Sequence, residues 1–332
     1  MIDFRYHLVS IIAVFLALAV GLVVGSTALS GKAVEVLTEG QRLALHQNAT
    51  LVQERSDLTK ELTAEQAFAQ AASPLLLTGL LTDEKVVLVE APGADASMTA
   101  GVATALREAG ATVTGDVQLN GSFLATDGHT EDQLTQLAQS LATTAGVTLA
   151  TQAQGSVSGQ QAASKVLAAS LLSGGGAGLD AADISAVLSQ FSQDGYLSLA
   201  NGSTISQPAT LAVLVAPAGS SPQPGTQVLV ALAVALRNAA EHDGTVMVGG
   251  SQSVVSRNVI NAENNVHQVS TVDMADTPTG QIMTAQALRL LLDGKAPGQY
   301  GITPGVAPSP APTPSATSTV TPSTHTSSGA HK

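Results

Sequence analysis

The sequence predicts an α/β protein in which a single N-terminal transmembrane helix and a coiled-coil stalk precede a Rossmann-like parallel-sheet domain. Three observations predict this fold class. The chain begins with a long apolar stretch, a heptad pattern follows it, and two strand–helix–strand patterns occupy most of the remainder. Strands that alternate with helices favour a parallel sheet with right-handed crossovers. The domain is therefore expected to be built from two βαβ units.

The apolar stretch runs from Leu8 to Gly31, which is 24 residues without a charged side chain. As a helix it would reach about 36 Å, enough to cross the hydrocarbon core of a bilayer. The apolar region of a cleaved signal peptide is shorter, about 7–15 residues. We therefore expect residues 1–7 to be a cytoplasmic leader and residues 8–29 to be a retained transmembrane helix. Cleavage after Ala28 and a buried core helix are the alternatives.

Residues 32–72 are expected to form a helical stalk that ends at Pro74. Apolar residues recur every seven positions. The other core position of the heptad is polar in some repeats and apolar in another. The first position holds Leu37, Ala44, Leu51 and Leu58, and the second holds Asn48, Arg55 and Leu62. This pattern indicates a short coiled coil, formed by a homo-oligomer or with a partner protein. A single amphipathic helix that packs on its own domain explains the pattern equally well.

Residues 74–302 are expected to form an extracytoplasmic α/β domain. Its first βαβ unit starts with the buried strand "KVVLVE", and its second starts with "TLAVLVA". The similarity of the two units is explained equally by an internal duplication and by convergence on the sequence pattern that βαβ units share. The expected strands are 85–90, 111–119, 210–216, the segment "DGTVMVGG" and 267–273, and the expected helices are 96–109, 131–143, 160–172, 181–191, 226–242 and 279–295.

Residues 303–332 contain 6 Pro and 13 Ser or Thr and almost no large apolar side chains. Such a segment cannot bury enough surface to offset its ordering entropy, so we expect a disordered Pro/Ser/Thr-rich tail.

Composition excludes several classes of function. The net charge is −12, which argues against nucleic-acid binding because that function needs a basic surface. The chain has no cysteine, so disulfides, thiolate metal sites and cysteine nucleophiles are excluded. The loop "APGADAS" has one glycine where a dinucleotide fingerprint needs three. We therefore expect no enzyme, and we assign no catalytic or cofactor-binding residue.

Metal ligands are also sparse. The loop "TDGHTED" gathers Asp127, His129 and two further acids, and it is interpreted as a solvated loop in which Asp127 or Thr130 caps a helix. The glycines of "VGGSQSV" are typical of a tight turn, with an anion site at a helix start as the alternative. His267 and Asp273 flank one expected strand about 20 Å apart, too far to share an ion. No metal site is predicted.

Three blocks of the chain resemble the actinobacterial MctB family of copper transport or copper-efflux proteins. They are "DFRYHLVSIIAVFLALAVGLVVGS", "LREAGATVTGDVQL" and "VSTVDMADTPTGQIMTAQALRLLLDGKAPGQYG", and the resemblance covers about residues 1–302. The residues that match the family's leader are Asp3, Arg5, Tyr6 and His7, and those that match its closing block are Asp273, Gly280, Tyr300 and Gly301. The resemblance assigns no role to any of the eight.

The resemblance implies a membrane-associated protein outside the cytoplasm. From the apolar helix, the long domain after it and the Ser/Thr/Pro-rich tail, we expect a single pass through the cell membrane, with the N-terminus in the cytoplasm and the main domain outside. The resemblance leaves a place in the outer envelope open. It also implies a role in copper transport and copper homeostasis as a channel-forming oligomer, and copper enters by this resemblance only. One spanning helix cannot enclose a pore. The alternative is a SteB-like, non-enzymatic membrane adaptor that binds a SteA-like partner in envelope assembly and division.

A tight Cu(I) site is not expected in residues 74–302. Cu(I) prefers thiolate and thioether ligands, and this chain has no thiol. The thioethers of that segment are scattered, and two of them lie in apolar patterns typical of core positions. They belong to Met98, Met247, Met274 and Met283.

Overall fold

The computed structural model describes residues 4–149, 158–175, 179–200, 204–219, 225–251, 253–264 and 267–310. The chain divides into two compact units, residues 1–65 and residues 66–332, and each is described by itself. Asp3 and the tail beyond residue 310 lie outside the described residues.

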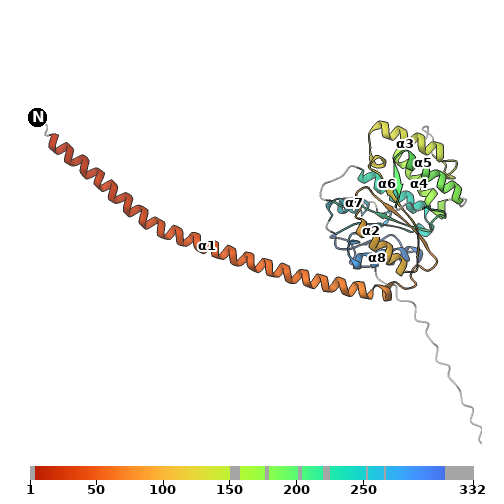
Figure 1. The fold of residues 1–332 in the computed structure, drawn as a ribbon, viewed down its shortest axis with the longest axis horizontal. Coiled ribbons are helices and arrows are strands. Elements are labelled where there is room, and N and C mark those ends of the chain that lie inside the picture. Colours follow the sequence, from red (N-terminus) through yellow and green to blue (C-terminus); the bar gives the residue numbers. More distant parts are fainter. Residues whose placement is uncertain are drawn as a thin grey trace, which may run out of the picture. The chain divides into compact units, whose positions relative to one another are not determined.

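A single helix, α1 (Phe4–Leu77), forms the first unit and enters the second (Figure 1). Within it, Tyr6–Ser26 is long and apolar enough to cross a membrane. The expectation that Pro74 ends the helix is wrong, because the helix continues to Leu77 and Thr78 donates its amide to the Pro74 carbonyl. A proline removes only its own amide from the helical ladder, so one more turn can form beyond it.

The second unit contains a seven-stranded sheet within the described residues, in the order β3-β2-β1-β4-β5-β6-β7. Neighbouring strands are parallel, except that β2 and β3 are antiparallel. The predicted parallel sheet is therefore confirmed. The strands are β1 (Lys85–Glu90), β2 (Thr112–Leu119), β3 (Leu197–Leu199), β4 (Leu211–Val215), β5 (Thr245–Val248), β6 (Ser270–Val272) and β7 (Gln299–Tyr300).

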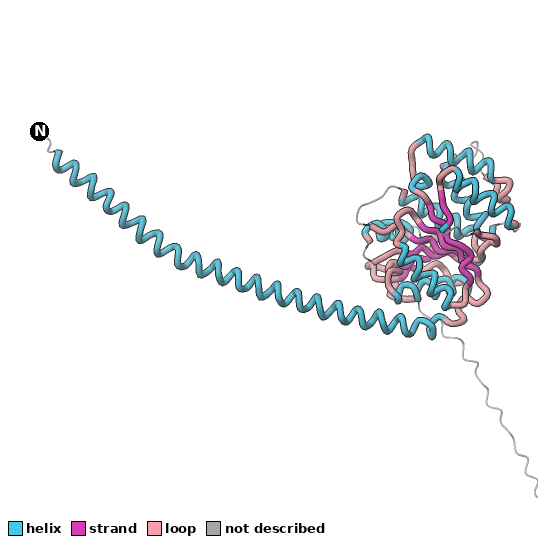
Figure 2. Tube along the Cα trace, in the orientation of Figure 1, coloured by secondary structure: helices cyan, strands magenta, loops and turns pink. Residues whose placement is uncertain are grey.

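Helices cover both faces of this sheet, and Figure 2 shows the strands between them. One face packs against α2 (Ala96–Glu108) and α8 (Pro278–Leu292), through β1 residues such as Val86 and Leu88. Val87 and Val89 point to the other face, as the two-residue period of a strand requires. The helices of that second core are α3 (Gly128–Leu141), α4 (Gly159–Leu171), α5 (Ala181–Gln193), α6 (Thr226–Ala239) and α7 (Val254–Asn264).

The first residues of the expected tail are attached to the domain. Gly301 donates its amide to the Ala307 carbonyl at 2.9 Å, and Ala307 donates to Gln299 at 2.8 Å. The expectation of disorder from residue 303 is therefore wrong for this short stretch, because its backbone groups find partners at β7. Residues 311–332 lie outside the described residues.

Candidate functional site

The loops after β1 and β4 flank the point where the strand order reverses, which is where open α/β sheets usually bind ligands. In their described parts, Ala218 donates its amide to the Gly93 carbonyl at 2.8 Å. Asp95 accepts from the Ser97 and Met98 amides and so caps α2. Hydrogen bonds to Ser97, first of all, hold the pKa of Asp95 below its ordinary value. The described parts of the two loops are therefore tied to each other and to a helix cap.

An open groove lies beside α2, over the face of the sheet that packs against α2 and α8. Its volume is about 680 Å³. One wall is α2, with Thr99, Thr104 and Arg107, and strands β1 and β2 form the floor. We call it the acidic groove after the two carboxyl side chains that line it, Glu90 and Asp116.

The two carboxyl groups come from neighbouring strands and point to the same face of the sheet. The register pairs Glu90 with Gln118 and Leu88 with Asp116. Glu90 is only 8% exposed, and Gln118 donates its side-chain amide to Glu90 Oε2 at 3.1 Å. Asp116 Oδ1 is buried without a hydrogen-bond partner among the described residues. A buried carboxylate oxygen without a donor favours the protonated form.

Burial, together with the negative charge of Glu90, raises the pKa of Asp116 to about 7. The side chain is thus poised to exchange a proton at neutral pH, and a cation that binds beside it would favour the carboxylate and displace the proton to water. Sequence reasoning missed this site because each acid lies alone in its strand. The available signal was the polar alternation of "TVTGDVQL", but the partner depends on the register.

In the closing block, a buried carboxylate binds backbone amides of the chain itself. The Asp273 side chain is 4% exposed and accepts two backbone hydrogen bonds. They come from Ile302 to Oδ1 at 2.8 Å and from Thr303 to Oδ2 at 2.7 Å. Gly301 has φ +135, and a Cβ there would lie 1.7 Å from Asp273 Oδ1. Asp273 and Gly301 therefore fix the segment that leaves β7.

Gly280 and Tyr300 complete this arrangement. A Cβ on Gly280 would lie 2.0 Å from the Met274 carbonyl oxygen, so the first turn of α8 approaches the preceding loop as only glycine allows. The Gly280 amide donates to Thr277, the N-cap of α8. Tyr300 is 9% exposed, and its ring occupies the space where a side chain on Gly298 would lie. The four closing-block residues shape the backbone in the described domain.

The leader residues are found elsewhere. Arg5, Tyr6 and His7 belong to the start of α1 in the first unit, and Tyr6 is 79% exposed. Asp3 lies outside the described residues.

The thioethers and imidazoles are also dispersed. Met98, Met247 and Met283 are buried in the two cores. Within the described residues, no three His, Cys, Asp or Glu side chains are grouped so that they could hold a metal ion. Asp127, not Thr130, caps α3. The expectation that the domain lacks a tight Cu(I) site stays a prediction for titration.

Two further expectations concern loops near β5 and β6. Ser251, in the "VGGSQSV" loop, donates both its amide and its hydroxyl to Asp276, so a carboxylate of the chain itself occupies this turn. His267 Nδ1 lies 2.6 Å from the Gln299 side-chain nitrogen, whereas Asp273 binds the backbone after β7. These two residues do not form a joint site.

Comparison with known proteins places these features in context. The family model described as "Copper transport outer membrane protein, MctB" matches residues 1–310. The copper transporter MctB of Mycobacterium tuberculosis (strain ATCC 25618 / H37Rv) is 28% identical over 310 residues, covering 91% of this chain and 96% of the relative. That of Mycobacterium leprae (strain TN) is 30% identical over 316 residues, covering 92% and 98%. The similarity thus spans the apolar helix, the stalk and the domain.

Proposed function

The chain belongs to the MctB family of copper transport outer membrane proteins, and we propose that it acts in copper transport and copper homeostasis at the membrane. The observation that carries this proposal is the length of the match, because residues 1–310 include both the membrane helix and the whole described domain. The chain is a membrane protein with one N-terminal apolar helix in its described part.

We propose further that this helix is retained, with its N-terminus in the cytoplasm and the domain outside. The support is its length and the Ser/Thr/Pro-rich composition of residues 303–332, which suits an exported segment. One helix cannot enclose an aqueous path, so conduction by this protein requires several copies or a second protein.

The retained helix predicts the mature N-terminus. N-terminal sequencing of protein extracted from membranes should find a sequence that begins before the apolar stretch, ahead of Leu8. A sequence that begins near Leu29 would contradict retention, because it would show cleavage after Ala28. Carbonate washing of the membranes is the matched control. It should not release the protein, because a spanning helix resists this treatment.

The described domain is better suited to Cu(II) than to Cu(I). Glu90, Asp116 and Gln118 place oxygen ligands in one open groove. Cu(II) accepts such ligands, whereas Cu(I) prefers sulfur. We therefore expect competition titrations of the purified full-length chain to find no tight Cu(I) site and only weak Cu(II) binding. Asp116→Asn should weaken the Cu(II) binding, while Asp83→Asn, in the exposed turn before β1, should not. Stoichiometric capture of Cu(I) at sub-nanomolar free copper would contradict this expectation.

The adaptor function remains the second candidate, favoured by the exposed apolar side chains of α1 outside its membrane span. Deleting the gene separates the two functions. Copper transport predicts a changed cellular copper content and copper sensitivity, restored by the full-length gene. Sensitivity to cell-wall antibiotics with unchanged cellular copper would favour an adaptor that binds a SteA-like partner.

A further inference from the structure

One face of the stalk carries apolar side chains that nothing in the described chain covers. Leu51, Leu58 and Leu62 are 63%, 65% and 54% exposed. They follow one another at intervals of seven and four residues, so they share a face of α1. We call this face the seam, formed by Ala44, Asn48, Leu51, Arg55, Leu58 and Leu62.

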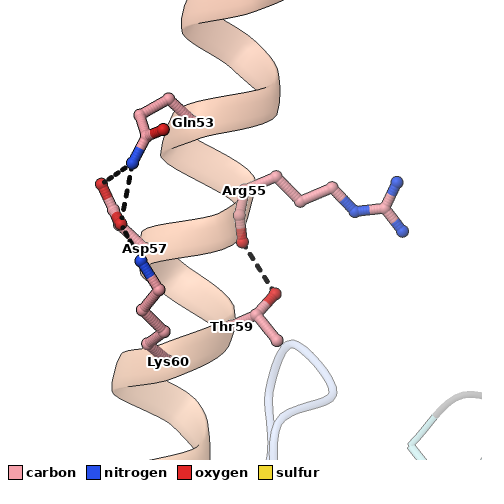
Figure 3. A network of polar contacts seen from close by, with 5 residues as sticks. All are labelled: Gln53, Arg55, Asp57, Thr59 and Lys60. Atoms are coloured by element: carbon pink, nitrogen blue, oxygen red, sulfur yellow. Dashed lines mark hydrogen bonds and ion pairs between the residues drawn. The ribbon is translucent and has the colours of Figure 1, made fainter.

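The opposite face of the same segment is polar and internally satisfied. Asp57 accepts hydrogen bonds from Gln53, at 3.1 and 3.2 Å, and from Lys60, at 3.0 Å (Figure 3). Figure 3 shows the Arg55 side chain pointing away from this network. Arg55 forms no ion pair with the described residues, and its backbone carbonyl accepts from Thr59. The stalk thus has a neutralised outer face and a seam with an unneutralised cation.

We propose that two copies of this chain associate through a parallel, in-register coiled coil along the seam. The orientation rests on the retained anchor of the proposed function and not on its copper chemistry. Copies that enter one membrane in the same direction have parallel stalks that start at the same depth. Each seam residue then faces the same residue of the other copy.

Charge and polarity fit this arrangement. Asn48 would face its counterpart at an a position, where a buried Asn specifies register and two-stranded association. Glu54 borders the seam immediately before Arg55, at the g position of the heptad. In a parallel pair, an a residue contacts the preceding g residue of the other helix. The Arg55 guanidinium would therefore meet the Glu54 carboxylate of the second copy.

The membrane span independently fits a second copy. Small residues occur at every fourth position, as Ala13, Ala17, Gly21 and Gly25. The first three lie on one face of α1, beside Leu16, Val20 and Val24. Small residues at this spacing let two spanning helices approach closely. The span and the stalk can thus associate with the same second helix.

The absence of cysteine makes a direct test possible. Single-cysteine variants of the full-length chain are oxidised in their own membranes and separated without reductant. Leu51→Cys and Leu58→Cys should form disulfide-linked dimers in high yield. Gln53→Cys and Lys60→Cys lie at the same heights on the outer face, so several-fold less dimer is expected. Crosslinking of both seam positions to themselves requires a parallel pair in register, because an antiparallel pair matches itself at one height only.

Equal yields on the two faces, or no seam disulfide in membranes that retain the protein, would overturn the proposal. A charge reversal tests the pairing itself in the Leu51→Cys background. Arg55→Glu should reduce the dimer yield several-fold, because it places like charges together. Adding Glu54→Arg should restore it, and no change with Arg55→Glu would refute the Arg55–Glu54 pair. If the protein is lost from the same membranes, the retained anchor has failed. If deleting the gene leaves the cellular copper content unchanged, the transport function has failed.

Discussion

Gly301→Ala is expected to destabilise the domain by roughly 3–5 kcal/mol, near the upper end of single-residue effects. Two causes add at this position. The φ of +135 is a backbone conformation that alanine rarely adopts, and the new Cβ would lie 1.7 Å from Asp273 Oδ1. Asp273 cannot move away without breaking its hydrogen bonds to the Ile302 and Thr303 amides. The substitution therefore also releases the segment that follows β7.

Urea unfolding of the purified full-length chain, followed by circular dichroism of the domain, measures this effect. Gly305→Ala is the matched control, since Gly305 also has a positive φ of +95 but no atom within 4 Å of the position that a Cβ would take. It should cost only the backbone strain, about 1 kcal/mol. Equal unfolding midpoints for Gly301→Ala and Gly305→Ala would show that the close approach to Asp273 contributes nothing.

The strongly patterned parts of the domain could be predicted from sequence. The strand "KVVLVE" and the helix after it are confirmed as β1 and α2, and the strand that follows is confirmed as β2. These segments have continuous apolar runs or clear helical spacing, bounded by a Pro-Gly turn and Gly110. Local pattern and tertiary burial agree there, so the pattern was sufficient.

Other elements depend on contacts that no local pattern reveals. Strand β3 has three residues and is stabilised by antiparallel pairing with β2, and β7 has two. Helix α7, the segment "VVSRNVINAEN", was not predicted, because its six polar residues outnumber its five apolar ones, although the apolar ones recur at helical spacing. The seam of the stalk was visible as a heptad pattern. Whether a second copy packs against it depends on contacts between two chains, which the pattern of one chain does not reveal.

The closing block illustrates the same limit at single residues. Its residues were recognised by resemblance without a role. Their role in the backbone depends on distances such as that between Gly280 and the Met274 carbonyl. The acidic groove required the register of β1 against β2, including an irregularity between Val86 and Val87. A register shift of one residue would move a side chain to the other face of the sheet.

The raised pKa of Asp116 predicts an unusual dependence of stability on pH. The folded chain holds this proton up to about pH 7, whereas the ordinary pKa of the group is 3.8. Between these values the folded state binds more protons than the unfolded state, so this group's contribution to stability falls as pH rises. The contribution is fully present below about pH 4 and is lost above about pH 7.

Asp116→Asn should therefore stabilise the domain at pH 8 by about 1–2 kcal/mol, because it removes a carboxylate that ionises beside Glu90. The full shift would correspond to roughly 4 kcal/mol, and the partial exposure of the side chain reduces it through solvent screening. Urea midpoints measured from pH 4.5 to pH 8 should show the variant and the natural chain converging at low pH. Asp132→Asn, on the exposed surface of α3, controls for loss of one negative charge. If Asp116→Asn were equally stabilising at pH 4.5 and pH 8, a titrating Asp116 would be contradicted. A variant that is more stable only because Asn packs better would show the same stabilisation at every pH.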